Sequence, residues 1–194
     1  MRNIYFVTGN TGKVKEVLKM APPEMEIEQI DYDYPEIQVD ELEQVASHGA
    51  KHSSEFLKKP IIVEDSGLFV DVLDGFPGPY SAYVFKKIGN EGILKLMAGE
   101  KDRGATFKSV VGYCEPGGNP LLFVGSVDGK ISEEIRGKHG FGYDPIFSTG
   151  ESTFAEMGIE KKNEVSHRRR AFEAFLSWFI EGSVDGPDQP TQTF

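Results

Sequence analysis

The stretch Ile61-Ile62-Val63-Glu64-Asp65-Ser66-Gly67-Leu68 decides how the rest of the chain is interpreted. The β-branched residues after Pro60 predict a buried strand, and the Ser-Gly pair predicts a turn that ends it. Side chains alternate between the faces of a strand, so Glu64 and Asp65 cannot both fill the same core. Because an unpaired buried carboxylate is unfavourable, these acids indicate a metal, a basic partner or a reacting water. A solvated turn is the alternative.

The composition predicts one acidic domain. The chain has 194 residues, 39% of them hydrophobic, and a formal net charge of -10. This charge argues against a protein that binds long nucleic acid by its phosphates. The single cysteine, Cys114, excludes an intramolecular disulfide. Since no run approaches the ~18 apolar residues of a membrane span and no signal peptide is visible, we expect a cytoplasmic protein with no membrane partner.

A Gly-rich segment, Gly9-Asn10-Thr11-Gly12-Lys13, lies between a predicted strand over 3–8 and a helix that follows it. Free amide groups and the positive end of the helix attract anions, and Lys13 adds a cation. The segment lacks the spacing of a Walker A loop. Gly and Asn also serve simply to turn the backbone, so the local chemistry leaves both interpretations open.

Elsewhere the chain alternates between predicted helices and strands. Apolar residues recur at helical spacing over 42–57 and 171–180. On the first of these helices His48 and His52 share a face that suits a metal, but two surface histidines are the preferred interpretation. Further strands are predicted over 25–30, 68–73, 105–114 and 121–127, with an acidic loop over 31–36, a turn-rich connection over 75–82 and a short helix capped by Asn90-Glu91.

Two later segments carry groups suited to a flat polar ligand. Residues 137–145 contain Phe141, Tyr143 and Asp144 among glycines, which suits a stacked ring, although the aromatics are equally consistent with core packing. Residues 161–170 are strongly basic, which indicates an anion or heterocycle contact in so acidic a chain, although basic helix surfaces are usually only solvated. From Glu181 onward no apolar period survives, so we expect one domain over 1–180 and a disordered tail over 181–194.

Four motifs together resemble a known family. Thr8-Gly9-Asn10-x-x-Lys13, Glu64-Asp65-Ser66-Gly67-Leu68, Phe141-Gly142-Tyr143-Asp144-Pro145 and Ser166-His167-Arg168 have the order and spacing of the inosine triphosphate pyrophosphatases, the Ham1 family. The resemblance runs from about Ile4 to Ile180, with Glu64 where many relatives have Asp. It implies an α/β fold with a long mixed central β-sheet flanked by helices, two lobes around a deep cleft, and a homodimer. The implied activity is hydrolysis of ITP, dITP and XTP to the monophosphate and pyrophosphate with Mg²⁺.

The resemblance also implies roles for individual residues. Asp65 is the expected catalytic acid, which activates a water that attacks the α-phosphorus, and Glu41, Glu64 and Asp65 are the expected metal ligands. Lys162 and Arg168 are expected to contact the oxygen edge of the base, so that adenine is rejected. The full set of expected substrate contacts is Thr8, Gly9, Asn10, Lys13, Ser66, Phe141, Gly142, Tyr143, Asp144, Lys162, His167 and Arg168.

Two other functions remain open at this stage. One is a pyrophosphatase of the related Maf type that acts on other nucleotides, although the Phe-Gly-Tyr-Asp motif argues against it. The other is a nucleotide-binding regulatory module without turnover, against which Lys13, Glu41 and Asp65 argue. Incubation with ITP and Mg²⁺ separates these hypotheses.

Overall fold

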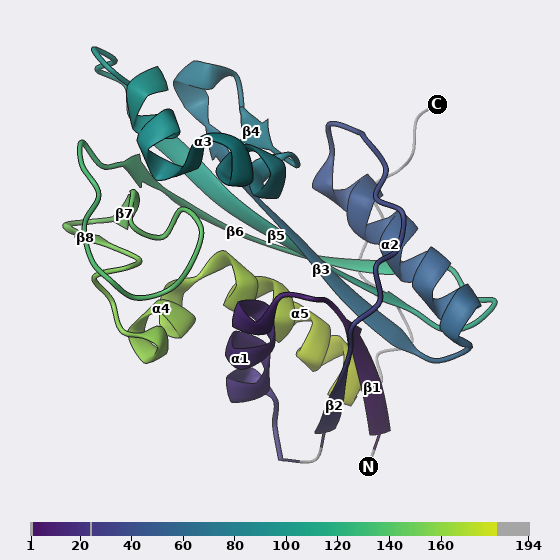
Figure 1. Cartoon of the computed structure of the whole chain (residues 1–194). Coiled ribbons are helices and arrows are strands. Elements are labelled where there is room, and N and C mark those ends of the chain that lie inside the picture. The colour runs from purple at the N-terminus through teal and green to yellow at the C-terminus, as the bar shows by residue number, and fades with distance from the viewer. Residues whose placement is uncertain (1, 24, 182–194) are drawn as a thin grey trace.

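The computed structural model describes residues 2–23 and 25–181. It is a mixed eight-stranded sheet with helices on both faces, which confirms the expected α/β fold (Figure 1). None of the helices in these ranges is long and apolar enough to cross a membrane. In chain order the elements are β1 (Arg2–Val7), α1 (Thr11–Met20), β2 (Met25–Ile30), α2 (Leu42–Leu57), β3 (Ile61–Val70), η1 (Asp71–Leu73), β4 (Pro77–Gly78), α3 (Ser81–Leu96), β5 (Gly104–Cys114), β6 (Leu121–Ile131), β7 (Phe147–Thr149), β8 (Ser152–Thr153), α4 (Ile159–Val165) and α5 (His167–Glu181).

The sheet changes from parallel to antiparallel pairing at β3. The strand order is β2-β1-β3-β5-β6-β7-β8, with β4 paired to β3. β1 is parallel to both of its neighbours, whereas β3, β5 and β6 form a long antiparallel set. β1 pairs with β3 only at Ile61 and Ile62. Since β3 continues beyond the end of β1, its later residues border the segment that leads from β1 into α1, which is where open α/β sheets bind ligands.

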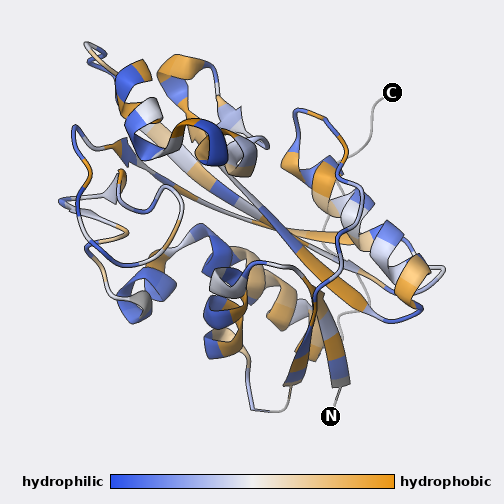
Figure 2. Cartoon of the chain, in the orientation of Figure 1, coloured by the Kyte–Doolittle hydropathy of each residue, from blue (hydrophilic) through white to orange (hydrophobic). Residues whose placement is uncertain are grey.

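The two faces of β3 are covered by different helices. Ile61 and Val63 belong to the hydrophobic cluster under α2, whereas Ile62 belongs to the cluster under α5. Figure 2 shows the corresponding hydrophobic stripes on the central strands and on both helices. Because side chains alternate along a strand, Asp65 continues the face under α2 and Glu64 continues the face under α5.

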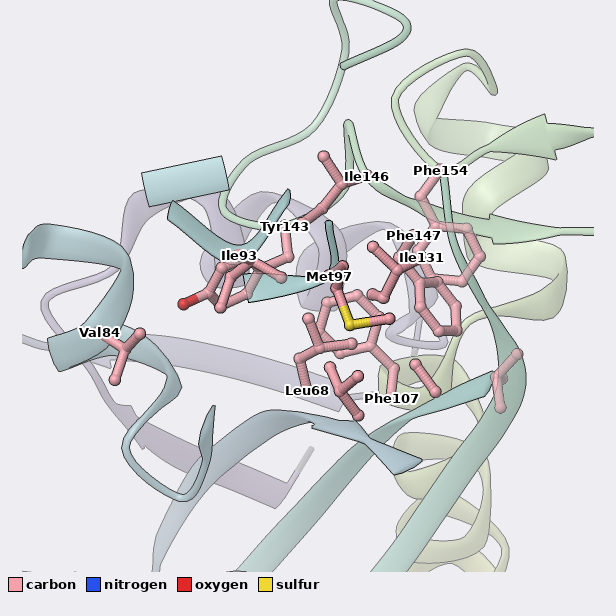
Figure 3. Packing of buried hydrophobic residues seen from close by; sticks show 13 residues of the cluster. Leu68, Val84, Ile93, Met97, Phe107, Ile131, Tyr143, Ile146, Phe147 and Phe154 are labelled. Atoms are coloured by element: carbon pink, nitrogen blue, oxygen red, sulfur yellow. The ribbon is translucent and has the colours of Figure 1, made fainter. Parts of the chain in front are cut away.

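A third hydrophobic cluster packs at the other end of the long strands. Leu68, Met97 and Phe107 meet Phe147 and Phe154 there (Figure 3). The ring of Phe107 lies 4.7 Å from that of Phe147 in an edge-on arrangement. This cluster, built from α3, the ends of β3 and β5 and the segment around β7, forms one lobe, and β1, β2, α1, α2 and α5 surround the other two clusters.

The predicted turn at Ser66-Gly67 is wrong. β3 runs without interruption from Ile61 to Val70, and every one of these residues has a partner on β5. Gly67 lies against β4, where a Cβ atom would come within 2.3 Å of the Gly78 carbonyl oxygen, so its role is close backbone approach. The two acids therefore lie within a strand rather than at its end.

Other expectations hold with small changes. The hairpin between β5 and β6 and the helix over 42–57 are confirmed. The short helix expected after Asn90 is the second part of α3, which is broken at Gly89 with φ 60°. The predicted tail begins at Glu181, which ends α5, and 182–194 lie outside the described residues.

Candidate active site

A cavity of about 800 Å³ lies where the two lobes meet β3. It contains all of the residues expected to contact substrate and also Asp65 and Glu64. The exception among the predicted site residues is Glu41, which is not part of its wall. The predicted residues that line it are Thr8, Gly9, Asn10, Lys13, Glu64, Asp65, Ser66, Phe141, Gly142, Tyr143, Asp144, Lys162, His167 and Arg168.

The Gly-rich segment forms the start of α1 and one wall of the cavity. The Asn10 side chain caps the helix by accepting hydrogen bonds from the amides of Gly12 and Lys13, at 2.9 and 3.2 Å. The Asn10 amide in turn donates to the Thr8 hydroxyl at 3.1 Å. Gly12 approaches Phe141 so closely that a Cβ atom would lie 2.8 Å from the ring. The helix start and the aromatic segment at 141 are therefore in direct contact.

Glu64 is buried on the α5 face and is surrounded by donors. Its carboxylate lies 2.9 Å from Lys13 Nζ and 3.3 Å from Arg168 Nη2, and it accepts a 2.5 Å hydrogen bond from Ser109. Burial alone would raise its pKa, but Arg168, Lys13 and Ser109 outweigh burial and hold the pKa well below its usual range. Glu64 is therefore an ionised partner of two cations.

Asp65 is in a different environment on the α2 face. Burial raises its pKa to about 6, Lys13 opposes the rise, and Glu64 and Glu36 add to it. Its Oδ2 atom is buried and has no hydrogen-bond partner among the described residues. Tyr34 lines the same part of the cavity, and burial followed by the charge of Asp65 raises the pKa of its phenol. A carboxylate that ionises near neutral pH and lacks a partner is suited to accept a proton or to bind a cation.

A buried ionic network forms the far side of the cavity. Lys162 donates to Asp144 at 2.7 Å and to Glu16 at 2.8 Å. Arg168 donates to the other oxygen of Glu16 at 2.5 Å and to the Ser66 hydroxyl at 3.2 Å. The side chains of Glu16, Lys162 and Arg168 are each at most 3% exposed. Glu16 thus ties α1 to both α4 and α5.

Aromatic rings complete this side of the site. Lys162 Nζ lies 4.8 Å from the centre of the Phe141 ring, and the Arg168 guanidinium carbon lies 5.4 Å from it. His167 is buried and stacks on Phe107 with ring centres 4.5 Å apart. Burial, together with the charge of Arg168, lowers the pKa of His167, so the ring is neutral. A flat ring that enters between these groups meets both hydrogen-bond donors and aromatic surface.

Two buried nitrogen atoms beside the cavity are not hydrogen-bonded within the part of the chain that the structure describes. Among the described residues, neither Arg168 Nε nor His167 Nδ1 has a hydrogen-bond partner. Buried polar atoms are normally paired, and these two side chains line the cavity. The network therefore leaves open hydrogen-bonding positions for a polar ligand.

Glu41, an expected metal ligand, does not line the cavity. Glu41 is the exposed residue that precedes α2, and its side chain makes no capping hydrogen bond. Within the described residues no group of three or more His, Cys, Asp or Glu side chains is arranged to hold a metal. The acids that join Asp65 at the cavity come instead from the loop over 31–36, which supplies Asp33 and Glu36.

Sequence reasoning also missed Glu16, Tyr34 and Ser109. Glu16 lies three residues after Lys13 on α1, so both project from one helix face, and that spacing was a usable signal. Ser109 reaches Glu64 only through the β3–β5 pairing, where it faces Ser66, and sequence spacing alone contains no sign of it. Tyr34 reaches the site because its loop crosses α2.

The cavity joins the start of α1, which is suited to bind an anion, to a slot lined by Phe141, Lys162, His167 and Arg168. This combination within an α/β fold defines a nucleotide-binding class of protein. The chain belongs to the Ham1 family, whose model matches residues 4–178. It is 58% identical to a dITP/XTP pyrophosphatase of Methanopyrus kandleri, covering 91% of this chain and 95% of that protein. It is 55% identical to a dITP/XTP pyrophosphatase of Methanosarcina mazei, covering 94% and 100%. The Ham1 protein of Staphylococcus aureus has a similar solved structure, with a TM-score of 0.81 at 32% identity over 93% and 99% of the two chains.

Proposed function

We propose that this chain hydrolyses non-standard purine nucleoside triphosphates (ITP, dITP and XTP) to the monophosphate and pyrophosphate, which removes them from the nucleotide pool. The observation that carries the proposal is the convergence of the phosphate-binding segment, Asp65 and the ionic slot on one cavity. The relatives named dITP/XTP pyrophosphatase, which match nearly the whole chain, support the choice of substrate.

The two ends of the substrate bind to different parts of the cavity. The triphosphate lies along Thr8, Asn10 and Lys13, where amide groups and the ammonium group offset its charge. The base enters between Phe141 and the buried cations. The triphosphate end therefore contacts α1 and its cap, and the base end contacts two cations that Glu16 of the same helix holds in place.

Discrimination between bases follows from the donors in the slot. The 6-oxo group of hypoxanthine or xanthine accepts a hydrogen bond from Arg168, whose Nε–H lacks a partner in the described structure. Adenine presents an amino group at this position and leaves the buried donor unpaired, which is unfavourable by about 1 to 3 kcal/mol. The neutral His167 adds a second polar atom at the same edge.

Asp65 acts as the general base. It takes a proton from a water whose oxygen attacks the α-phosphorus, a new bond forms between this oxygen and phosphorus, and the bond from the α-phosphorus to the bridging oxygen breaks. The electron pair of the broken bond leaves with pyrophosphate. The Asp65 carboxyl has a pKa of about 6, so it is ionised and still basic near neutral pH.

A divalent cation fits the same part of the cavity. The unpaired Oδ2 of Asp65 and the carboxylate of Glu36 are hard oxygen donors that line one wall. Mg²⁺ typically takes one or two carboxylates and completes its shell with water and phosphate oxygens, so a larger cluster of acids is not required. When bound, Mg²⁺ would neutralise charge on the phosphates. Removal of divalent cations with EDTA is expected to abolish turnover, and added Mg²⁺ to restore it.

The test of the activity is incubation with dITP or ITP and Mg²⁺. The expected products are pyrophosphate and the matching monophosphate, deoxyinosine monophosphate from dITP or inosine monophosphate from ITP. Orthophosphate release would indicate a different reaction, and binding without turnover would indicate a regulatory module. Asp65→Asn should lose turnover and keep much of its nucleotide affinity. Asp128→Asn, which changes an exposed acid on β6, serves as the matched control.

We also propose that the protein is a cytoplasmic homodimer, and the dimer rests on the family resemblance alone. The dimer is tested by light scattering coupled to size-exclusion chromatography. A mass near that of one 21.5 kDa chain would contradict it.

A further inference from the structure

Tyr34 stands on the wall of the cavity that is remote from the base slot. It packs against the hydrophobic cluster under α2, which also contains Ile61 and Val63 of β3. Because Asp65 continues the face of these two residues, Tyr34 and Asp65 lie on the same side of the strand. The slot residues Phe141 and Lys162 lie on the opposite side, with α4 and α5.

The position of the Tyr34 ring is fixed by Gly49. A Cβ atom at Gly49 would come within 2.6 Å of Cε2 of the tyrosine and 2.8 Å of its hydroxyl oxygen. The ring therefore rests directly on the backbone of α2, in a space that any larger residue would take from it. A ring held in this way presents its hydroxyl at a defined place in the cavity wall.

No hydrogen bond joins the Tyr34 hydroxyl to any of the described residues. The neighbouring Tyr32 differs, since its hydroxyl is paired with His52 Nε2 at 3.1 Å. A phenol is both donor and acceptor, and it is protonated at neutral pH. Tyr34 is thus a neutral donor that is open to a ligand.

The charges around the Tyr34 hydroxyl are mostly negative. Asp33, Glu36 and Asp65 line the cavity close enough to Tyr34 that burial and their charges together raise its pKa, and they repel phosphate oxygens. Lys13 is held by Glu64, which its ammonium group contacts at 2.9 Å on the other side of β3. A hydroxyl donor on the acidic side binds a phosphate oxygen without adding a second buried cation.

We propose that Tyr34 binds the pyrophosphate half of the substrate by donating a hydrogen bond to one of its oxygens. A nucleotide whose base lies in the slot beside Phe141 extends its outer phosphates past Lys13 toward α2, where Tyr34 stands. The inference rests on the proposed function, because it takes a nucleoside triphosphate as the substrate.

The test separates the two halves of the product. In Tyr34→Phe, the inhibition constant of inorganic pyrophosphate and the KM for dITP are expected to rise about tenfold, because one hydrogen bond to a phosphate oxygen is lost. The inhibition constant of inosine monophosphate is expected to stay within about twofold of wild type. Tyr5→Phe is the matched control: Tyr5 packs on the same hydrophobic cluster but lies outside the cavity wall, so neither constant should change.

A second variant moves the ring and keeps its hydroxyl. Gly49→Ala is expected to weaken pyrophosphate binding in the wild-type background, and to add little in the Tyr34→Phe background, where the donor is already absent. Unchanged pyrophosphate inhibition in Tyr34→Phe would overturn the inference. Equal weakening of pyrophosphate and monophosphate would also overturn it, because the contact would not belong to the outer phosphates.

Calorimetry keeps this inference separate from the proposed activity. Binding of inorganic pyrophosphate with Mg²⁺ is measured directly on wild type and Tyr34→Phe, and it requires no turnover. Failure to hydrolyse dITP would refute the proposed function, whereas equal pyrophosphate affinity in the two proteins, or none in either, would refute the role of Tyr34.

Discussion

Asp65→Asn should make the protein more stable at pH 8 while it removes activity. The folded protein holds Asp65 in surroundings that disfavour its charge, chiefly through burial, so its pKa rises from 3.8 to about 6. A rise of this size means that the ionised carboxylate lowers the free energy of unfolding by about 3 kcal/mol. Asparagine has nearly the same shape and no charge, so the substitution should recover a large part of it.

The sign of the pH dependence follows from the raised pKa. Below 3.8 the carboxyl is protonated in both the folded and unfolded chains, and the variant has no electrostatic advantage. Between 3.8 and about 6 the unfolded chain releases the proton first, so the wild-type protein loses stability as the pH rises. The advantage of Asp65→Asn should therefore grow through this window and be constant above about pH 7.

Urea unfolding in EDTA, at a series of pH values from 4 to 8, measures this difference without interference from bound cations. Asp128→Asn is the control, and its free energy of unfolding should differ from wild type by less than about 0.5 kcal/mol throughout. An advantage of Asp65→Asn that is equally large at pH 4 and pH 8 would refute the electrostatic reasoning. So would a variant that is less stable than wild type at pH 8.

Two further substitutions test the buried ionic network. Glu16→Gln removes the acid that pairs with both buried cations and should lower the free energy of unfolding by about 3 kcal/mol; urea unfolding beside the exposed Glu173→Gln checks this, and equal effects would contradict it. Ser109→Ala removes the hydroxyl that donates to Glu64 and should lower the free energy of unfolding at pH 8 by about 2 kcal/mol. Because the folded pKa of Glu64 is lowered, this stabilisation is present above its ordinary value of 4.5 and is lost as the pH falls toward the lowered value. A loss that stays constant as the solution is acidified would show that packing, rather than charge, is responsible.

Much of the fold could be predicted because periodicity and turn chemistry are local properties. The helix over 42–57 and the β5–β6 hairpin have clear apolar periods, and the structure has both. The predicted break at Ser66-Gly67 failed because a Ser-Gly pair is a local turn signal, whereas pairing with β5 along the whole of β3 is a tertiary effect. Position 67 requires glycine because the backbone of β4 packs directly against it, and sequence spacing alone does not reveal this contact.

Site residues could be predicted where a local motif places them at the cavity. They could not be predicted where the path of another segment decides which residue reaches it. Lys13 and Asp65 were found from strand ends and helix starts, and both line the cavity. Glu41 was selected because it matches the acid that precedes the second helix in the resembled family, but the cavity is lined by Glu36 of the preceding loop and not by Glu41. Which of two acids five positions apart faces a ligand depends on the path of that loop, and no periodic pattern constrains it.

The distribution of charge explains how a protein of net charge -10 can hold a triphosphate and still recognise a base by shape. In the slot, Lys162 and Arg168 are already paired with Glu16 and other buried acids, so they present fixed donors rather than free positive charge. A neutral purine is therefore selected by which of its edge atoms accept hydrogen bonds. On the α2 side, Lys13 is the cation that lowers the pKa of Asp65, but Glu64 already holds it. Under the proposed function, a divalent ion and neutral donors would offset the charge of the phosphates there. Base recognition thus depends on the α5 face of β3, where Lys13 also lies. A substitution on the α2 face should therefore alter phosphate binding without altering base specificity.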